Sequence, residues 1–424
     1  MEIYQKDWRY DILKPYVDAF TKASYSSFEV RGQENIPKDG VVIIAPNHCN
    51  ALMDALVVLR CIKGPVLFGA RADIFKKKTN ACLLKFLKIL PLVRRRDGLR
   101  NVSQNVATID KIVEAMDSGI PFCLFPEGTH RTKHSLLPIG KTPLRLSLAA
   151  LEKISPDKKI YIQPVSLEYG DYFRYRNTCL VSFSKPIDVR DELDKFSPEV
   201  HKEAEIYRHF SVLISEGLKS GLTWLPDDEY HEGRWSLMKA LRASGGGSLE
   251  DRLKRNQVCI ERMLEKEKEK PQKMYKLYDL ATEFENQRIE SGISINSFGK
   301  DLVKKLITKT IAMVFLLPIF LLSILIDWPA ILTAHFTKKA FKDVTFKNSA
   351  CMVVNLVATP ILTIAWAIVF FIFMPWYWAL GFTIFTLASY PLFYECLEFF
   401  RIYVSDWKLM FNRKLDKMYK KLVA

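Results

Sequence analysis

Short apolar runs alternate with segments of helical periodicity over residues 28–190. The apolar runs predict strands at 41–45, 65–70, 120–125, 160–166 and 178–184. Between them, apolar residues three and four positions apart predict helices at about 51–62, 79–89, 102–118 and 142–153. Strands that alternate with helices are typical of a mostly parallel sheet flanked by helices. We therefore expect an α/β domain over residues 28–190.

The segments on either side of this domain have different patterns. Residues 1–27 place apolar and aromatic side chains such as Trp8 at helical spacing, which predicts an N-terminal amphipathic helix. Such a helix lies in a membrane interface or packs on the protein's own core, and the pattern fits both. Residues 191–300 are charged and predict a helical extension, in which Ser248 and Asp251 mark one helix start.

Long apolar runs set residues 301–424 apart as a C-terminal α-helical membrane region. The runs lie at about 306–326, 350–373 and 376–394, and each approaches the roughly 20 residues that span a bilayer. The last two are joined by a tight Met-Pro-Trp turn and predict a transmembrane hairpin at about 350–394. Pro318 interrupts the first run, and basic segments flank the apolar runs. A first run that does not cross keeps every basic segment on the cytoplasmic face. We therefore expect an integral membrane protein with two crossings and its α/β domain on that face.

The composition narrows the choice of partners. A formal net charge of +15 over 424 residues favours an anionic partner. Because no zinc-finger spacing, RNP-like aromatic motif or basic zipper occurs, we expect a lipid bilayer or a phosphorylated substrate and no nucleic acid. Neither GxGxxG nor a P-loop occurs, and the eight cysteines are scattered without a CxxC pair, as in proteins of reducing compartments.

A histidine at the end of a predicted strand carries the first candidate chemistry. His48 follows the run at 41–45, and Asp54 comes next in the predicted helix. Histidine takes up and returns protons near neutral pH, and a carboxylate can fix its tautomer. The alternative is structural: His48 would cap the helix, and Asp54 would be an ordinary acidic residue of its first turn. The two residues alone do not distinguish a catalytic from a structural role.

Polar and basic residues follow one further predicted strand and one short apolar, strand-like stretch. One group forms a Pro-Glu-Gly turn with cations behind it, and the other is an arginine run after an apolar stretch. The planar guanidinium group of arginine suits a phosphate, although a basic turn that touches lipid headgroups is the alternative. We expect the substrate to be bound by Arg94, Arg95, Glu127, Gly128, Thr129, Arg131 and Lys133, with Lys141 and Arg145 behind them.

Together these stretches resemble the phospholipid/glycerol acyltransferase family over roughly residues 28–190. The family's blocks are N-H-x4-D, an apolar stretch ending in arginine, F-P-E-G-[TS], and an apolar strand closing on proline. They are matched in this order at 47–54, 90–94, 125–129 and 160–165, with five residues instead of four between His48 and Asp54 in the first block. The resemblance implies an α/β acyltransferase domain. It also implies that His48 takes the proton from a glycerol hydroxyl group as this group attacks an acyl thioester, while Asp54 holds the imidazole.

Finer features resemble the branch that acylates glycerol 3-phosphate or dihydroxyacetone phosphate. They include FEVRGQENIP at 28–37, Asn50 in the first block, and SLLP at 135–138. Ala55 departs from this branch, which often has proline there, and Arg95 can replace Arg94 in the alignment of the second block. The resemblance thus predicts a membrane-bound O-acyltransferase of glycerophospholipid synthesis.

Several alternatives to this function stay open. Lysophosphatidate acyltransferase uses the same chemistry on a larger acceptor, and a transacylase would move acyl chains without a thioester. A catalytically silent lipid-binding membrane protein belongs to another class, but it would have no need of His48 and Asp54. We expect acyl-CoA or acyl carrier protein as co-substrate and no cofactor. We also expect no metal, because His130 and His134 lack an evident third ligand.

Overall fold

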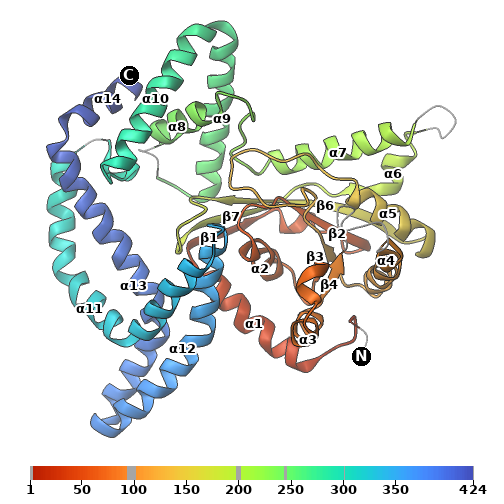
Figure 1. Cartoon of the computed structure of the whole chain (residues 1–424), viewed down its shortest axis with the longest axis horizontal. Coiled ribbons are helices and arrows are strands. Elements are labelled where there is room, and N and C mark those ends of the chain that lie inside the picture. Colours follow the sequence, from red (N-terminus) through yellow and green to blue (C-terminus); the bar gives the residue numbers. More distant parts are fainter. Residues whose placement is uncertain (1–2, 93–101, 197–201, 243–245, 300, 424) are drawn as a thin grey trace. The chain divides into compact units, whose positions relative to one another are not determined.

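The computed structural model describes residues 3–92, 102–196, 202–242, 246–299 and 301–423 (Figure 1). The chain forms two compact units. The first unit comprises Met1–Lys22, Phe28–Tyr172 and Thr178–Leu222, and the second comprises Ala23–Ser27, Phe173–Asn177 and Thr223–Ala424.

A sheet that has eight strands among the described residues organises the first unit. Its strands are β1 (Tyr25–Arg31), β2 (Gly40–Pro46), β3 (Leu67–Arg71), β4 (Ile89–Leu92), β5 (Phe122–Cys123), β6 (Lys159–Tyr169), β7 (Asn177–Phe183) and β8 (Ile187–Asp188). Their order in space is β1-β7-β6-β2-β5-β3-β4, and β8 pairs with β6. Strand β2 runs parallel to β5 and β6, and β3 runs parallel to β4 and β5, whereas β7 and β8 are antiparallel to β6. The expected mostly parallel sheet is confirmed.

Helices flank this sheet as expected. They are α1 (Trp8–Ala23), α2 (Leu52–Cys61), α3 (Lys78–Phe86), α4 (Val102–Asp117), α5 (Thr142–Lys153), α6 (Val189–Leu193) and α7 (Glu203–Lys219). Figure 1 shows α7 on one side of the sheet and α1, α2 and α3 on the other. Helix α1 buries Tyr10 against Phe86 and leaves Trp8 70% exposed, so it packs on the core, and its place in a membrane interface stays a prediction.

The second unit is helical. Its helices are α8 (His231–Arg242), α9 (Leu249–Glu269), α10 (Pro271–Glu290), α11 (Leu302–Ala340), α12 (Phe346–Phe373), α13 (Trp376–Phe411) and α14 (Arg413–Val423). Ser248 caps α9 as expected, in a capping box with Asp251. Buried residues of α8, α9, α10 and α14, among them Tyr278, Phe284 and Tyr419, form an aromatic-rich core.

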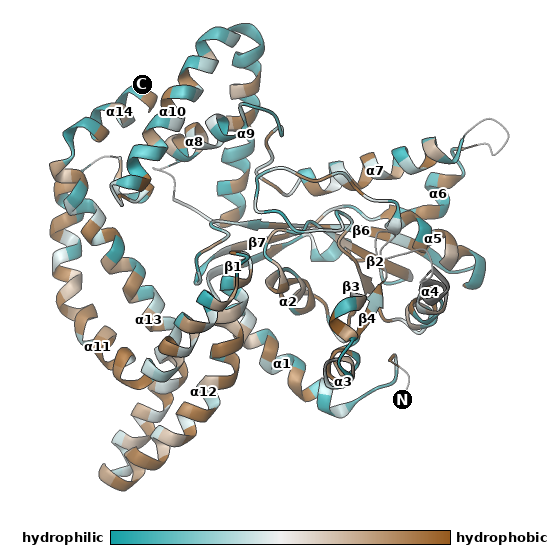
Figure 2. Cartoon of the chain, in the orientation of Figure 1, coloured by the Kyte–Doolittle hydropathy of each residue, from teal (hydrophilic) through white to brown (hydrophobic). Residues whose placement is uncertain are grey.

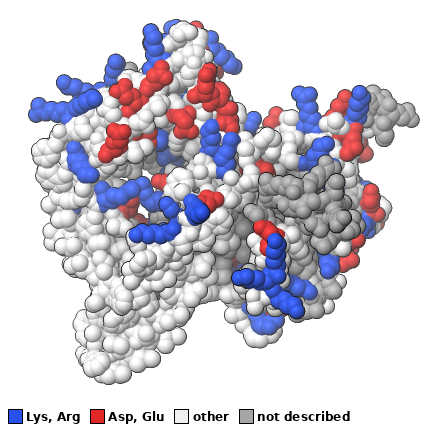
Figure 3. All heavy atoms as spheres, in the orientation of Figure 1, with Lys and Arg blue, Asp and Glu red and all other residues white. Residues whose placement is uncertain are grey.

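Within the described residues, α11, α12 and α13 are long and apolar enough to cross a membrane. Helices α12 and α13 form a hairpin around Met374 and Pro375. Figure 2 shows hydrophobic residues along these helices, and in Figure 3 the protruding lower-left end, where α12 and α13 meet, shows no Lys, Arg, Asp or Glu. The number of crossings stays a prediction.

Candidate active site

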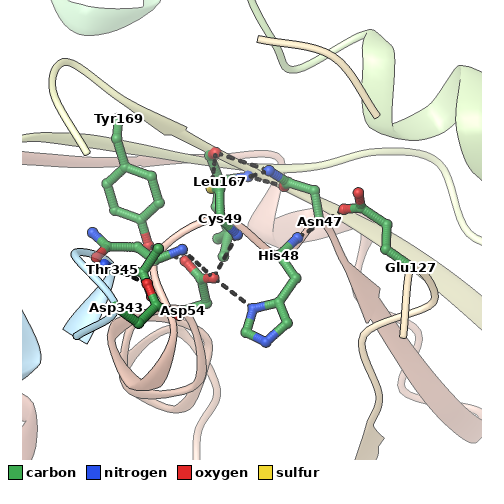
Figure 4. Close-up of polar contacts among 10 residues, drawn as sticks. Asn47, His48, Cys49, Asp54, Glu127, Leu167, Tyr169, Asp343 and Thr345 are labelled. Atoms are coloured by element: carbon green, nitrogen blue, oxygen red, sulfur yellow. Dashed lines mark hydrogen bonds and ion pairs between the residues drawn. The ribbon is translucent and has the colours of Figure 1, made fainter. Parts of the chain in front are cut away.

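The His48 side chain lies at the turn between β2 and α2. The turn brings Nδ1 of His48 within 2.7 Å of Oδ2 of Asp54 (Figure 4). The imidazole stacks on Phe125 with 3.9 Å between ring centroids. Because Phe125 follows β5, which pairs with β2 in parallel, the ring is held by the ends of two neighbouring strands. The ring is therefore held between a carboxylate and an aromatic face.

The Asp54 carboxylate is fully buried and satisfied by hydrogen bonds. Oδ2 also accepts from the main-chain N–H groups of Cys49 at 2.8 Å and Asn50 at 2.7 Å, and Oδ1 accepts from the Tyr169 hydroxyl at 2.7 Å. A carboxylate oxygen accepts hydrogen bonds, so Nδ1 of His48 donates to Oδ2. The Nε2 atom then carries the lone pair, which is the arrangement of a general base.

The turn that carries His48 has an uncommon backbone conformation. Ala51, which precedes α2, has φ 46° and ψ −123°. A residue with a side chain pays about 1–3 kcal/mol to hold such a conformation. The amides of Cys49 and Asn50 reach the Asp54 carboxylate from this turn. The strain is therefore located where the main chain folds around the carboxylate.

Strand β6 supports the turn from the side of β2 opposite to β5. The Asn47 side chain accepts from the main-chain N–H of Leu167 at 2.7 Å and donates to its carbonyl oxygen at 3.2 Å. Tyr169, two residues further along β6, reaches Asp54. Tyr169 was not among the predicted site residues, because its contact depends on the pairing of β2 with β6 and no motif marks it.

The Glu127 carboxylate binds two segments of main chain. One oxygen accepts from the N–H of His48 and the other from the N–H of Leu137, both at 2.8 Å. Burial raises the pKa of the Glu127 carboxyl, and the two amide hydrogen bonds oppose this shift. Gly128 completes the turn with φ 69°, a conformation that glycine adopts without strain. Glu127 thus joins the loop after β5 to the His48 turn.

The structure places the remaining predicted binding residues in different environments. Arg131 donates from its main chain to the carbonyl oxygen of His48 at 3.0 Å and from its guanidinium group to Ser135 at 2.6 Å. Thr129 is exposed and Lys133 is partly buried in the same loop. Arg94 and Arg95 lie outside the described residues. The binding roles of these residues stay predictions.

Two further cations of this region pack on an aromatic ring. The ammonium group of Lys141 lies 4.7 Å from the centroid of the Tyr207 ring, and Arg145 donates to the hydroxyl group of Tyr207 at 3.3 Å.

His130 and His134, the two histidines whose spacing was considered for a metal site, contact different aromatic rings. The ring of His130 lies edge-on to that of His48, with 5.4 Å between centroids, and the ring of His134 faces Tyr172.

The environment of Cys49 is that of a structural residue and not of a nucleophile. It is buried, and burial followed by the charge of Asp54 raises the pKa of its thiol well above the usual range. A thiol that stays protonated at neutral pH is a poor nucleophile. The geometry therefore fits direct transfer with His48 as base better than a covalent intermediate on Cys49.

Known proteins are similar in sequence to the part of the chain that contains this site. Residues 27–168 match the family model described as Acyltransferase. A 99-residue segment is 29% identical to Glycerol-3-phosphate O-acyltransferase 1 of Saccharomyces cerevisiae. The match covers 23% of this chain and 13% of that protein.

A solved structure is also similar. The 1-acyl-sn-glycerophosphate acyltransferase from Thermotoga maritima has a TM-score of 0.37 and 20% sequence identity, over 51% of this chain and 83% of that chain. Similarity at this level is too low to compare the two chains element by element. The family match and the four motif blocks cover the same part of the chain. The family match and the relative together support the phospholipid acyltransferase family for residues 27–168.

Proposed function

We propose that this protein transfers a fatty acyl group from an acyl thioester to a hydroxyl group of glycerol 3-phosphate or dihydroxyacetone phosphate. The observation that carries the proposal is the buried Asp54 carboxylate on Nδ1 of His48, which leaves Nε2 as the base. The relative in Saccharomyces cerevisiae is named a glycerol-3-phosphate O-acyltransferase, which supports this acceptor class. Lysophosphatidate acyltransferase remains the alternative.

The reaction needs one base and one acid, and His48 supplies both. Nε2 takes the proton of the acceptor hydroxyl group while the oxygen attacks the thioester carbonyl carbon. The carbon–sulfur bond breaks, and the imidazolium returns its proton to the leaving thiolate. Asp54 stabilises the imidazolium that exists between these steps. Glu127 acts as a positioning residue through the main chain of His48.

The cations of the domain supply the charge that a phosphate needs. We assign the acceptor phosphate to Arg131 and Lys133 together with Arg94 or Arg95, because guanidinium and ammonium groups bind phosphate strongly. The donor is acyl-CoA or acyl carrier protein. The apolar helices of the second unit hold the protein in the bilayer, and we place the acyltransferase domain on the cytoplasmic face.

The test uses the full chain in neutral detergent with a radiolabelled acyl thioester. Glycerol 3-phosphate, dihydroxyacetone phosphate and lysophosphatidate are offered separately to the wild type and to His48→Ala. We expect transfer to a three-carbon phosphate and a loss of about 10²- to 10⁴-fold in the variant. His209→Ala is the matched control, since its Nε2 pairs with Glu192 at 2.7 Å and neither residue belongs to a motif block.

The outcomes separate the alternatives. Transfer to lysophosphatidate alone would assign the protein to the next acylation. Transfer only from a phospholipid donor would identify a transacylase. Full activity of His48→Ala would contradict the proposed mechanism, and no transfer to any acceptor would favour the silent lipid-binding protein.

A further inference from the structure

The second unit contains a basic cavity of about 510 Å³. Its walls come from the end of α11, the start of α12, the middle of α13 and the loop 173–177. The cations among its described lining residues are Arg174, Lys338, Lys339, Lys347 and Arg401, and the carboxylate among them is Glu398. We call this hollow the basic cavity.

The positive charge of the basic cavity is only partly compensated. Glu398 is shared between Arg174 at 2.6 Å and Arg401 at 3.0 Å. Lys339 and Lys347 have no ion-pair partner among the described residues. The first turn of α12 also lines the cavity, and the N-terminus of a helix adds partial positive charge. An anion that enters would therefore meet several unneutralised cations.

The wall that carries Arg174 is held in place. Tyr175 is buried and shares hydrogen bonds with Ser24 at 3.2 Å and Asn355 at 3.4 Å. Arg176 pairs with Glu395 and donates to the carbonyl oxygen of Ala23 at 2.7 Å. A site whose charged groups are fixed before binding loses less entropy when the ligand arrives. The loop 173–177 is thus a built wall of the cavity.

The basic cavity lies where the apolar helices become polar. Lys338 and Lys339 belong to the last turn of α11, and Lys347 belongs to the first turn of α12. Large apolar side chains such as Phe336 and Val353 are exposed on the same helices next to these lysines. Basic pockets between membrane helices bind the head groups of anionic lipids, whose acyl chains lie along the apolar surface.

We propose that the basic cavity binds the phosphate group of an anionic glycerolipid. The proposal does not depend on the acyl transfer proposed above, because it concerns residues outside the four motif blocks. A free phosphate ion shares this chemistry. The exposed apolar surface beside the cavity favours a lipid as the carrier of the phosphate.

The experiment measures binding of fluorescent phosphatidate to the full chain in neutral detergent. The cavity variant is Lys339→Gln/Lys347→Gln. The control variant is Lys304→Gln/Lys414→Gln, which removes the same charge from two exposed lysines that do not line the cavity. At the usual contribution of a cation near a lipid surface, we expect binding to weaken roughly 30-fold in the cavity variant and less than about 3-fold in the control.

Other probes identify the source of the phosphate. Fluorescent phosphatidylcholine should bind the wild type and both variants equally. Displacement of phosphatidate by millimolar inorganic phosphate would show that the phosphate alone suffices, and its failure would show that the lipid is needed; both support the phosphate site. Equal phosphatidate affinity of the cavity and control variants would overturn the proposal, as would binding that does not weaken with salt. Neither result depends on whether acyl transfer is observed.

Discussion

The Asp54 carboxylate accepts hydrogen bonds from an imidazole, from two main-chain amides and from the phenol of Tyr169. Each of these donors reduces the cost of burying the charge, so each also fixes the position of the carboxylate. The orientation of the His48 ring follows from this position. Residues that never touch the substrate can therefore change the rate.

Tyr169→Phe removes one of these donors without removing volume. We expect kcat to fall about tenfold, equivalent to about 1.4 kcal/mol, at an unchanged KM for both substrates. The reason is that Oδ1 of Asp54 loses its partner at 2.7 Å and the carboxylate becomes free to turn. Tyr161→Phe is the control, because Tyr161 lies on the same strand and donates to Asp39 instead. Equal effects of the two variants would contradict the role of Tyr169.

Glu127 should make stability depend on pH. Burial raises the pKa of this carboxyl above its usual 4.5. A raised folded-state pKa stabilises the fold fully below the unfolded-state pKa, and this contribution is lost as pH rises through the folded-state value. Because glutamine does not titrate, the stability of Glu127→Gln relative to wild type should increase as pH is raised from about 4 to about 7. Thermal unfolding in neutral detergent measures this difference.

Glu285 provides the opposite control. Burial tends to raise the pKa of Glu285, but Arg288 and Lys239 lower it overall. A lowered pKa contributes stability that is present above the unfolded-state value and is lost as pH falls. The stability of Glu285→Gln relative to wild type should therefore decrease over the same rise in pH. Parallel trends in the two variants would contradict the assignment for Glu127.

At the scale of elements, the site depends on the register of three parallel strands. Ile44 of β2 pairs with Cys123 of β5 and with Gln163 of β6. The ends of β2 and β5 therefore bring the His48 turn and the Glu127 turn together, and β6 supplies its support. Helix α7 packs against β6, and Ser166 of this strand donates to the carbonyl oxygen of Leu218 in α7 at 2.7 Å.

Gly217 allows α7 to approach β6 closely. The pattern of the sequence predicts that Gly217 and Gly221 mark the end of this helix, and α7 ends between them at Lys219, so that Gly217 itself lies inside the helix. A β-carbon at Gly217 would lie 2.8 Å from Pro164, closer than real β-carbons approach. The glycine is therefore required by packing rather than by a turn.

Gly217→Ala should destabilise the first unit. Overpacking costs about 1–3 kcal/mol, and the better helix propensity of alanine returns about 1 kcal/mol. We therefore expect a net loss of up to about 2 kcal/mol, measured by thermal unfolding. Gly381→Ala in α13 is the control, because a β-carbon there meets nothing within 4 Å. A stability of Gly217→Ala at or above that of wild type would contradict the close contact.

At the scale of the whole molecule, the course of α11 bears on how the chain meets the bilayer. Lys309 near its start pairs with Asp406 of α13 at 2.5 Å, and Lys338 near its end lies 5.9 Å from the ring centroid of Tyr394, also in α13. The two ends of α11 therefore contact positions of α13 that are only twelve residues apart. Figure 1 shows the curved helix, and the prolines within it are a physical reason for bending.

This course supports the expectation that the first apolar run does not cross. In sealed vesicles of a Cys82→Ser background, we expect Lys304→Cys, Lys342→Cys and Lys417→Cys to react with an impermeant maleimide from the same side. Cys82 is replaced because it is exposed. Labelling of Lys304→Cys from the side opposite to the other two would instead show three crossings.

Much of the fold was predictable because the local spacing of apolar residues indicates which segments form strands and which form helices. The apolar runs predicted β2, β3, β5, β6 and β7, and the helical spacing predicted α2, α3, α4 and α5. Strands β1, β4 and β8 were not among the predicted strands. Each is stabilised by pairing with a distant strand, and β8 has two residues, so local pattern is weak there.

The sequence by itself determined the order of elements, the motif blocks, the candidate pair His48 and Asp54, and the apolar helices. These features depend on periodicity and spacing, which are local properties of a chain. Only the tertiary structure decided that Glu127 binds the amide of His48 and that Tyr169 reaches Asp54. It also gathered the cations of the basic cavity from four segments of the second unit. Such contacts join residues far apart in sequence, and they exist only once strand register and helix packing are set.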